Sequence, residues 1–116
     1  MARSVLIVDD HASFRRFARR LFEEAGFAVV GEAGDAESAL ATAKALRPDL
    51  VLLDVMLPDG SGVLVADEHD GEPAILLVSS RSAEDLGIAE LDGRRRFLRK
   101  DELTLERLRD LAAGGA

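Results

Sequence analysis

PDLVLLD, residues 48–54, is the stretch of the sequence that decides the fold. Residues 50–53 form an apolar run without alternation, which is typical of a strand buried on both faces of a parallel sheet. The run ends at Asp54, and Pro58 and Gly60 then predict a shaped loop in place of a continuing strand. A carboxylate that closes a buried strand is costly to desolvate unless a polar group or a metal ion meets it, so Asp54 is a candidate functional residue.

Apolar runs on either side of this segment predict four further strands, at residues 5–8, 27–30, 74–78 and 96–99. Apolar residues at helical spacing predict helices between them. The predicted helices cover residues 14–25, 36–43, 82–91 and 105–112, with a short or irregular helix over 63–70. Gly26 is expected to close the first helix, Asp35 to cap the second and Pro48 to stop it.

Strands that alternate with helices imply a parallel sheet, because each right-handed crossover carries the chain back to the same edge. Five such units predict an α/β fold, a doubly wound sandwich around a five-stranded sheet. A chain of 116 residues fits one domain of this kind. Ligands of such folds bind at the carboxyl ends of the strands, near the point where the strand order reverses.

Composition excludes several classes of protein. The chain has no cysteine, which rules out disulfides and thiolate metal sites and favours a cytoplasmic location. Its net charge of -7 and its lack of Trp and Tyr argue against a direct nucleic-acid partner. The first ten residues hold too short an apolar run for a signal peptide or a membrane span. Two basic groups, Arg15/Arg16/Arg19/Arg20 and Arg94/Arg95/Arg96, are interpreted as a solvated face or a partner-docking patch.

Polar residues occupy the predicted strand ends. Asp9 and Asp10 end the first strand, Asp54 the third, Ser79 the fourth and Lys100 the fifth. These strand ends are expected to meet at one edge of the sheet. Three carboxylates there would raise one another's pKa values unless a cation neutralised them. Mg²⁺, held by carboxylates, carbonyls and phosphate oxygens, fits this need.

The chain also resembles bacterial response-regulator receiver domains. The matching segments are VLIVDDH (5–11), PDLVLLDVMLPDGSG (48–62), ILLVSS (75–80) and FLRKDEL (97–103), and the resemblance covers essentially the whole chain. It is greatest to receivers that precede a helix-turn-helix output domain. The resemblance implies a flavodoxin-like (βα)5 fold with strand order 2-1-3-4-5 and a short third helix. It also implies a single receiver domain over residues 1–116, without an output domain.

The same resemblance assigns the site. Asp54 would accept a phosphoryl group from a phosphohistidine on a sensor histidine kinase, and Lys100 would neutralise charge on the phosphoryl oxygens. Mg²⁺ would be bound directly by Asp10 and Asp54, by Asp9 largely through water, and by the backbone carbonyl of Met56. Ser79 would hydrogen-bond the phosphoryl group and Phe97 would turn inward with it, which changes the surface around the fourth and fifth strands and helices.

Other interpretations of these residues stay open. Taken alone, the Asp9–Asp10 pair is more typical of a helix N-cap and its neighbour, and only the other polar strand ends favour a functional role. Ser80 competes with Ser79, and Phe97 fits a core position. His11 and His69 are interpreted as surface residues without a catalytic role.

For the whole chain, the alternative function is a receiver-like protein-binding module that signals without phosphorylation. An aspartyl phosphatase is disfavoured because no Asp-x-Asp pattern surrounds Asp54, and a flavin-binding protein because no Ser/Thr-rich loop follows the first strand. The sequence thus predicts a signalling protein and not an enzyme. It leaves the downstream protein partner and homodimer formation open.

Overall fold

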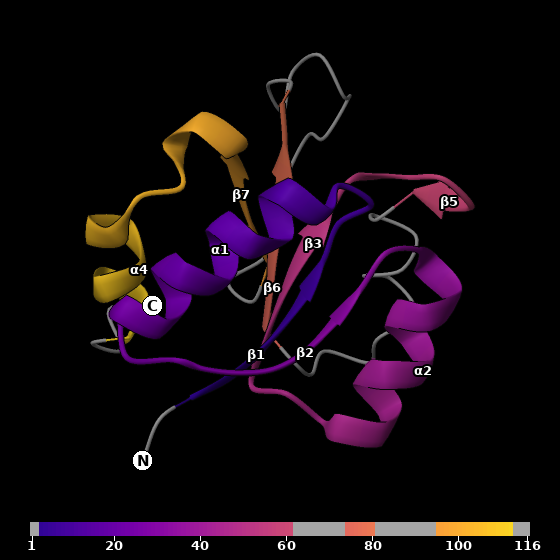
Figure 1. The fold of residues 1–116 in the computed structure, drawn as a ribbon, viewed down its shortest axis with the longest axis horizontal. Coiled ribbons are helices and arrows are strands. Elements are labelled where there is room, and N and C mark those ends of the chain that lie inside the picture. Colours follow the sequence, from indigo (N-terminus) through magenta and orange to yellow (C-terminus); the bar gives the residue numbers. More distant parts are fainter. Residues whose placement is uncertain (1–2, 62–73, 81–94, 113–116) are drawn as a thin grey trace.

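The computed structural model describes residues 3–61, 74–80 and 95–112 (Figure 1). Five strands form one parallel sheet: β1 (Ser4–Val8), β2 (Ala28–Ala33), β3 (Leu50–Asp54), β6 (Ala74–Ser79) and β7 (Arg95–Arg99). Their order across the sheet is β2-β1-β3-β6-β7. Since β6 and β7 are the fourth and fifth strands of this sheet along the chain, the predicted flavodoxin-like order 2-1-3-4-5 is confirmed.

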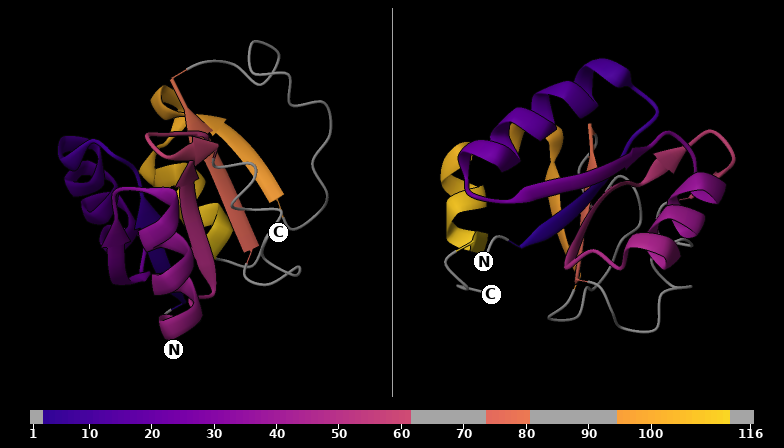
Figure 2. Two further views of the ribbon diagram at one scale, coloured as in Figure 1. Left: turned by 90° about the vertical axis from the view of Figure 1, so that its right-hand side faces the viewer. Right: turned by 60° about the horizontal axis from the view of Figure 1, so that its bottom comes forward.

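Helices cover both faces of the sheet (Figure 2). The helices α1 (Ala12–Glu24) and α4 (Leu105–Ala112) lie on one face, and α2 (Ala36–Leu46) lies on the other. A short 3₁₀ helix, η1 (Lys100–Glu102), follows β7 directly. The helices predicted over 63–70 and 82–91, including the expected shortness of the first, lie outside the described residues. Within the described part of the chain, no helix has the length and apolar character needed to cross a membrane.

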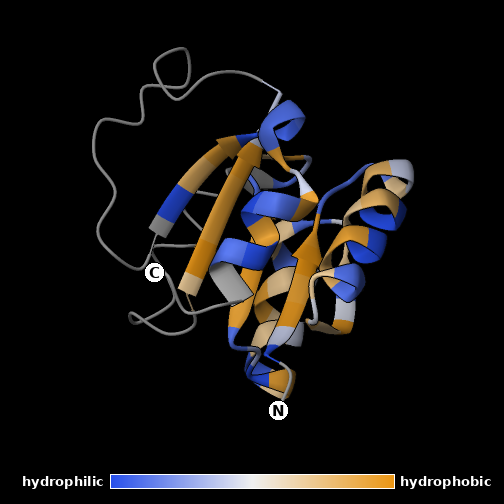
Figure 3. Ribbon diagram, turned by 90° about the vertical axis from the view of Figure 1, so that its left-hand side faces the viewer, coloured by the Kyte–Doolittle hydropathy of each residue, from blue (hydrophilic) through white to orange (hydrophobic). Residues whose placement is uncertain are grey.

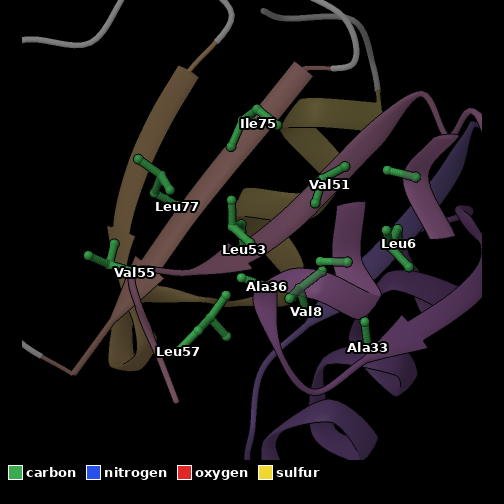
Figure 4. Close-up of a cluster of buried hydrophobic side chains, with 12 residues drawn as sticks. Leu6, Val8, Ala33, Ala36, Val51, Leu53, Val55, Leu57, Ile75 and Leu77 are labelled. Atoms are coloured by element: carbon green, nitrogen blue, oxygen red, sulfur yellow. The ribbon is translucent and has the colours of Figure 1, made fainter. Parts of the chain in front are cut away.

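Two apolar clusters, one on each face of the sheet, hold these layers together. The cluster on the α2 side contains Leu6, Val51 and Leu53, together with alanines of α2 (Figure 4). The opposite cluster is built around Phe22 of α1, whose ring meets that of Phe27 edge-on at 5.1 Å between centroids. Successive residues of β1 and β3 therefore point into opposite clusters, which explains why their sequences are continuously apolar. The apolar colouring of the central strands is visible in Figure 3.

The edge strand β2 differs from its predicted bounds. The sequence predicts a strand over residues 27–30, whereas the observed strand is Ala28–Ala33. Phe27 precedes the strand and packs in the core, and Glu32 belongs to the strand although it is polar. The bounds of β2 are set by its backbone pairing with β1, which extends to Ala33. Because β2 is an edge strand with exposed positions, the paired residues do not all need to be apolar, and an apolar run does not mark its end.

The bounds of the first two helices follow the predicted signals. Gly26 follows the C-cap residue Ala25 of α1 and adopts a φ of +96°, a conformation that favours glycine, and so closes the helix as predicted. Helix α2 ends at Leu46, and the next residue, Arg47, adopts a left-handed φ of 46° before Pro48. The helix thus ends before Pro48, as predicted, and the left-handed residue Arg47 forms its C-cap.

The N-terminus of α2 is capped twice. Asp35 accepts a hydrogen bond from Ser38 N at 2.7 Å, as the sequence predicts. A second carboxylate, Asp59, accepts hydrogen bonds from Ala36 N at 2.7 Å and from Glu37 N at 3.2 Å. Three amides that lack partners inside the helix are thereby satisfied.

Replacing Asp35 by alanine is expected to lower the free energy of unfolding by about 1 kcal/mol, because the Ser38 amide loses its acceptor. Urea denaturation followed by circular dichroism measures the loss. Asp35→Asn is the matched variant, since asparagine also caps helices well. An alanine variant as stable as the asparagine variant would show that this cap contributes nothing.

The loop after β3 contains a small antiparallel hairpin that the sequence does not predict. The strands β4 (Met56–Leu57) and β5 (Gly60–Ser61) pair across a turn formed by Pro58 and Asp59. Leu57 is buried in the α2-side cluster, while the turn residues are exposed. The hairpin brings the Asp59 carboxylate against the start of α2.

Candidate functional site

Acidic residues gather at the carboxyl ends of β1 and β3. Asp9 follows the last residue of β1 and Asp54 ends β3, and these two strands are neighbours in the sheet. Together with Asp10 and His11 they form a group in which one ligand atom from each residue lies within 4.8 Å of the others. Asp9 is fully buried and Asp54 is only 3% exposed, whereas Asp10 faces solvent. The three predicted carboxylates therefore share one site.

Lys100 reaches this cluster from the end of β7, the edge strand two positions from β3 in the sheet. It follows the last residue of β7, and its Nζ lies 2.7 Å from Asp9 Oδ2 and 3.4 Å from Asp54 Oδ2. The same ammonium lies 4.6 Å from the centroid of the Phe14 ring on α1, a cation–π contact. The three aspartates and Lys100 therefore converge at one edge of the sheet, as the sequence predicts.

Charge in the cluster is only partly balanced. Three ionised carboxylates and one ammonium leave two negative charges uncompensated. Burial raises the pKa of Asp54 above its ordinary value, and repulsion from Asp9 adds to this, while the Met56 amide and Lys100 oppose it. Burial alone would lower the pKa of Lys100, but bonding and attraction to Asp9 and Asp54 outweigh it, so the pKa is raised. The site thus favours a charged Lys100 and disfavours ionisation of Asp54.

The remaining predicted site residues lie close by along the chain or the sheet. Met56 donates its backbone N–H to Asp54 Oδ1 at 3.0 Å, which fixes the orientation of that carboxylate. Ser79 ends β6, where the preceding residue is in register with Asp54, and it is 2% exposed. Phe97 lies within β7 and packs, partly buried, against the α2-side cluster. Their roles stay predictions.

His11 is a neighbour of the site that the sequence interpretation missed. Its Nδ1 lies 3.1 Å from Asp9 Oδ1 and 3.0 Å from Asp10 Oδ1, and its backbone N–H donates to Asp9 Oδ1 at 2.8 Å. Its side chain is 66% exposed, so the surface interpretation holds for the outer part of the ring. The signal that could have found it is its position directly after two acidic residues. The other histidine, His69, lies outside the described residues.

The donor set fits a hard divalent cation. All three acidic residues supply carboxylate oxygens, which Mg²⁺ prefers, and the uncompensated charge of two matches that of the ion. Buried Asp9 and Asp54 would shield such an ion on one side, and exposed Asp10 leaves the other side open to water or to phosphate oxygens. The arrangement is therefore suited to bind a cation and an anionic group together.

A parallel α/β sheet with an acidic site at its carboxyl edge, faced by one lysine, defines the class of doubly wound proteins whose ligands bind at the strand ends. Residues 5–112 match the family described as "Response regulator receiver domain". The chain belongs to this family, and the predicted resemblance is confirmed.

Individual relatives agree with this assignment. The chain is 41% identical over 121 residues to the nitrate/nitrite response regulator protein NarP of Escherichia coli, an alignment that covers 95% of this chain and 55% of NarP. It is 38% identical over 117 residues to the DNA-binding transcriptional activator DevR/DosR of Mycobacterium tuberculosis, covering 97% of this chain and 54% of DevR/DosR. The predicted likeness to receivers with DNA-binding outputs is thus confirmed.

A solved structure supports the same placement. The signal receiver domain of the putative response regulator NarL from Mycobacterium tuberculosis superposes with a TM-score of 0.76 at 28% identity. That match covers 98% of this chain and 95% of the NarL domain. The chain spans about half the length of NarP and DevR/DosR but nearly all of a receiver domain, so the similarity concerns the receiver portion of such regulators.

Proposed function

We propose that this protein is a phosphoacceptor receiver in two-component signal transduction, working in the cytoplasm, and that Asp54 accepts a phosphoryl group from a histidine kinase. The observation that carries the proposal is the buried Asp54 carboxylate, held by the Met56 amide beside Lys100 in a chain of the receiver family. We further propose that residues 1–116 act as one receiver domain, which transmits a signal and is not an enzyme.

The proposed reaction moves one phosphoryl group. A carboxylate oxygen of Asp54 forms a bond to phosphorus while the phosphorus–nitrogen bond of the phosphohistidine breaks, and the imidazole nitrogen keeps the electron pair. Lys100 would neutralise charge on the phosphoryl oxygens, and the distance of 3.4 Å between its Nζ and Asp54 Oδ2 supports this role. The hydrogen bond from Met56 N fixes Asp54 Oδ1 and so limits rotation of the nucleophile.

A metal ion is part of this proposal. Asp10 and Asp54, the Met56 carbonyl and, mainly through water, Asp9 would hold Mg²⁺, in keeping with the donor set described above. Bound there, Mg²⁺ would supply positive charge to the carboxylates and to the incoming phosphoryl group. His11 is placed to orient the two N-terminal carboxylates through its contacts with both.

The signal is proposed to arise from a shift between two arrangements of the same chain. New bonds from the phosphoryl group to Ser79 and Lys100 would favour one arrangement of the strand ends. Phe97 on β7, packed partly buried beside the core, would follow the movement of Ser79. A downstream protein partner would then recognise the changed surface around β6 and β7, and formation of a homodimer is one way to present that surface.

Intact-mass spectrometry after incubation with acetyl phosphate and Mg²⁺ tests the proposal. We expect the wild-type protein to gain the mass of one phosphoryl group and Asp54→Asn to gain none, because an amide is not a nucleophile toward phosphorus. Chelation of the metal should abolish the gain in the wild type. Asp59→Asn, which changes an exposed aspartate in the same loop, is the matched control and should be phosphorylated normally.

An unmodified wild type under these conditions would contradict the proposal. It would instead favour the alternative function, a receiver-like binding module that signals without phosphorylation. A gain of mass in both proteins would show that another residue is the acceptor.

A further inference from the structure

The arginines of α1 do not form one uniform surface. In the sequence, Arg15 and Arg19 belong to the same basic group as Arg16 and Arg20, but in the structure both form ion pairs with Glu32 of the edge strand β2. Arg15 Nε lies 3.1 Å from Glu32 Oε1, and Arg19 Nε lies 2.8 Å from Glu32 Oε2. Only 22% of the Arg15 side chain and 38% of the Arg19 side chain are exposed. The interpretation of this group as a solvated face therefore holds only for the exposed part of these two side chains, and the alternative, a partner-docking patch, stays a prediction.

Arg15 makes one contact that Arg19 is not seen to make. Its Nη1 donates a hydrogen bond to the backbone carbonyl oxygen of Asp9. That carbonyl belongs to the peptide group between Asp9 and Asp10, the two acidic residues at the end of β1. The peptide group on the other side of Asp9 is also held, because Asp9 N donates to Ala33 O at 3.0 Å. Both peptide planes next to Asp9 are thus fixed by β2 or by a side chain bound to β2.

Fixing these planes fixes the directions of the acidic side chains. A peptide plane that can rotate changes the backbone dihedral angles of the residues on both sides of it, and with them the aim of both carboxylates. Asp9 is fully buried and points its Oδ2 to within 2.7 Å of Lys100 Nζ, so its aim matters for the charge balance of the site. Glu32, held between two guanidinium groups, in turn keeps Arg15 in place.

We propose that Arg15 is a positioning residue of the cation site: by bonding the Asp9 carbonyl while anchored to Glu32, it orients the Asp9–Asp10 pair for binding of a divalent cation. The inference rests on the proposed function, since it concerns the same site. In this role Arg15 would act through the backbone carbonyl of Asp9 and not as a ligand of the cation.

Electrostatics and positioning predict opposite effects of removing Arg15. Loss of a positive charge near the carboxylates would by itself strengthen the binding of a cation. Loss of the restraint on the Asp9–Asp10 peptide would weaken it, and groups that orient metal ligands typically change metal affinity by about 10-fold to 100-fold. A weaker affinity is therefore a signature that charge alone does not produce.

The experiment compares three substitutions that each remove one positive charge. Arg15→Gln, Arg19→Gln and Arg16→Gln all change the net charge equally, Arg19 shares the partner Glu32, and Arg16 is exposed. Mg²⁺ affinity is measured by NMR titration of backbone amides, because the chain has no Trp or Tyr for intrinsic fluorescence. We expect Mg²⁺ to bind Arg15→Gln about tenfold more weakly than the wild type, and the two controls within about twofold of it.

The outcomes separate this inference from the proposed function. A wild type that binds Mg²⁺ while the three variants respond alike, or a tighter-binding Arg15→Gln, overturns the inference alone. A wild type that binds no Mg²⁺ overturns the proposed function and this inference with it. If Arg15→Gln does not fold, Arg15→Lys takes its place: one ammonium cannot hold Glu32 and the Asp9 carbonyl in the same forked way, so wild-type affinity in that variant also overturns the inference.

Discussion

Replacing Lys100 by methionine is expected to lower the free energy of unfolding by about 3 kcal/mol at neutral pH, or the melting temperature by roughly 10 °C. The reason is that Asp9, which is fully buried, loses the ammonium that lies 2.7 Å from its Oδ2. Methionine keeps most of the apolar stem, so the loss reports the charge and not the packing. Thermal unfolding in the absence of divalent cations measures it.

Two comparisons make the Lys100 result specific. Lys44 is the other lysine of the chain and lies exposed on α2, so Lys44→Met should leave the melting temperature nearly unchanged. Added Mg²⁺ should recover part of the loss in Lys100→Met, because a bound cation replaces the missing positive charge and stabilises the folded state by mass action. Equal melting temperatures for the two variants would show that Lys100 does not balance the buried carboxylates.

Asp54→Asn is expected to stabilise the unphosphorylated protein at neutral pH by on the order of 1 kcal/mol. Asp54 is 3% exposed, and its charge is costly to bury, whereas asparagine has nearly the same shape without the charge. Lys100 keeps its closer partner Asp9 in the variant, since the contact that is lost is the one at 3.4 Å. If Asp54 is the phosphoryl acceptor, as proposed, the carboxylate that this role needs lowers the stability of the unphosphorylated protein.

The pH dependence of this difference follows from the pKa of Asp54. Burial raises that pKa above the ordinary value of 3.8, so the folded state holds its proton to higher pH than the unfolded chain. The contribution of Asp54 to stability should then fall as the pH rises from 3.8 through the raised pKa, so the stability advantage of Asp54→Asn over the wild type should grow across this range. Urea denaturation across this range tests it. A stability difference that is constant with pH would mean that the pKa of Asp54 is not raised.

The sheet and its acidic edge are predictable from the sequence because both depend on local patterns. Continuous apolar runs identify β1 and β3, and the polar residue after each run places Asp9 and Asp54 at the carboxyl edge. Parallel topology then brings them together whatever the details of packing. Lys100 could be placed for the same reason, since it directly follows a predicted strand.

Other contacts could not be predicted, because they depend on which partner a polar side chain meets in three dimensions. Arg15 is one of four arginines on α1, and nothing in the helical pattern distinguishes the one that reaches the Asp9 carbonyl. Asp59 looks like an ordinary turn residue, yet its partners lie 22 and 23 positions away in α2. The end of β2 was misplaced for a related reason, since its pairing uses the backbone and not side-chain burial.

The Asp59 carboxylate connects the hairpin after β3 to the N-terminus of α2, the helix that joins β2 to β3. Two of the three capped amides of α2 depend on that one side chain, which lies only five residues after Asp54 in the sequence. A rearrangement of the loop after β3 that withdrew Asp59 would expose the Ala36 and Glu37 amides and fray the first turn of α2. Hydrogen exchange at those two amides should accordingly become faster when the loop after Asp54 rearranges, and it would report that change from α2 and not from β6 or β7.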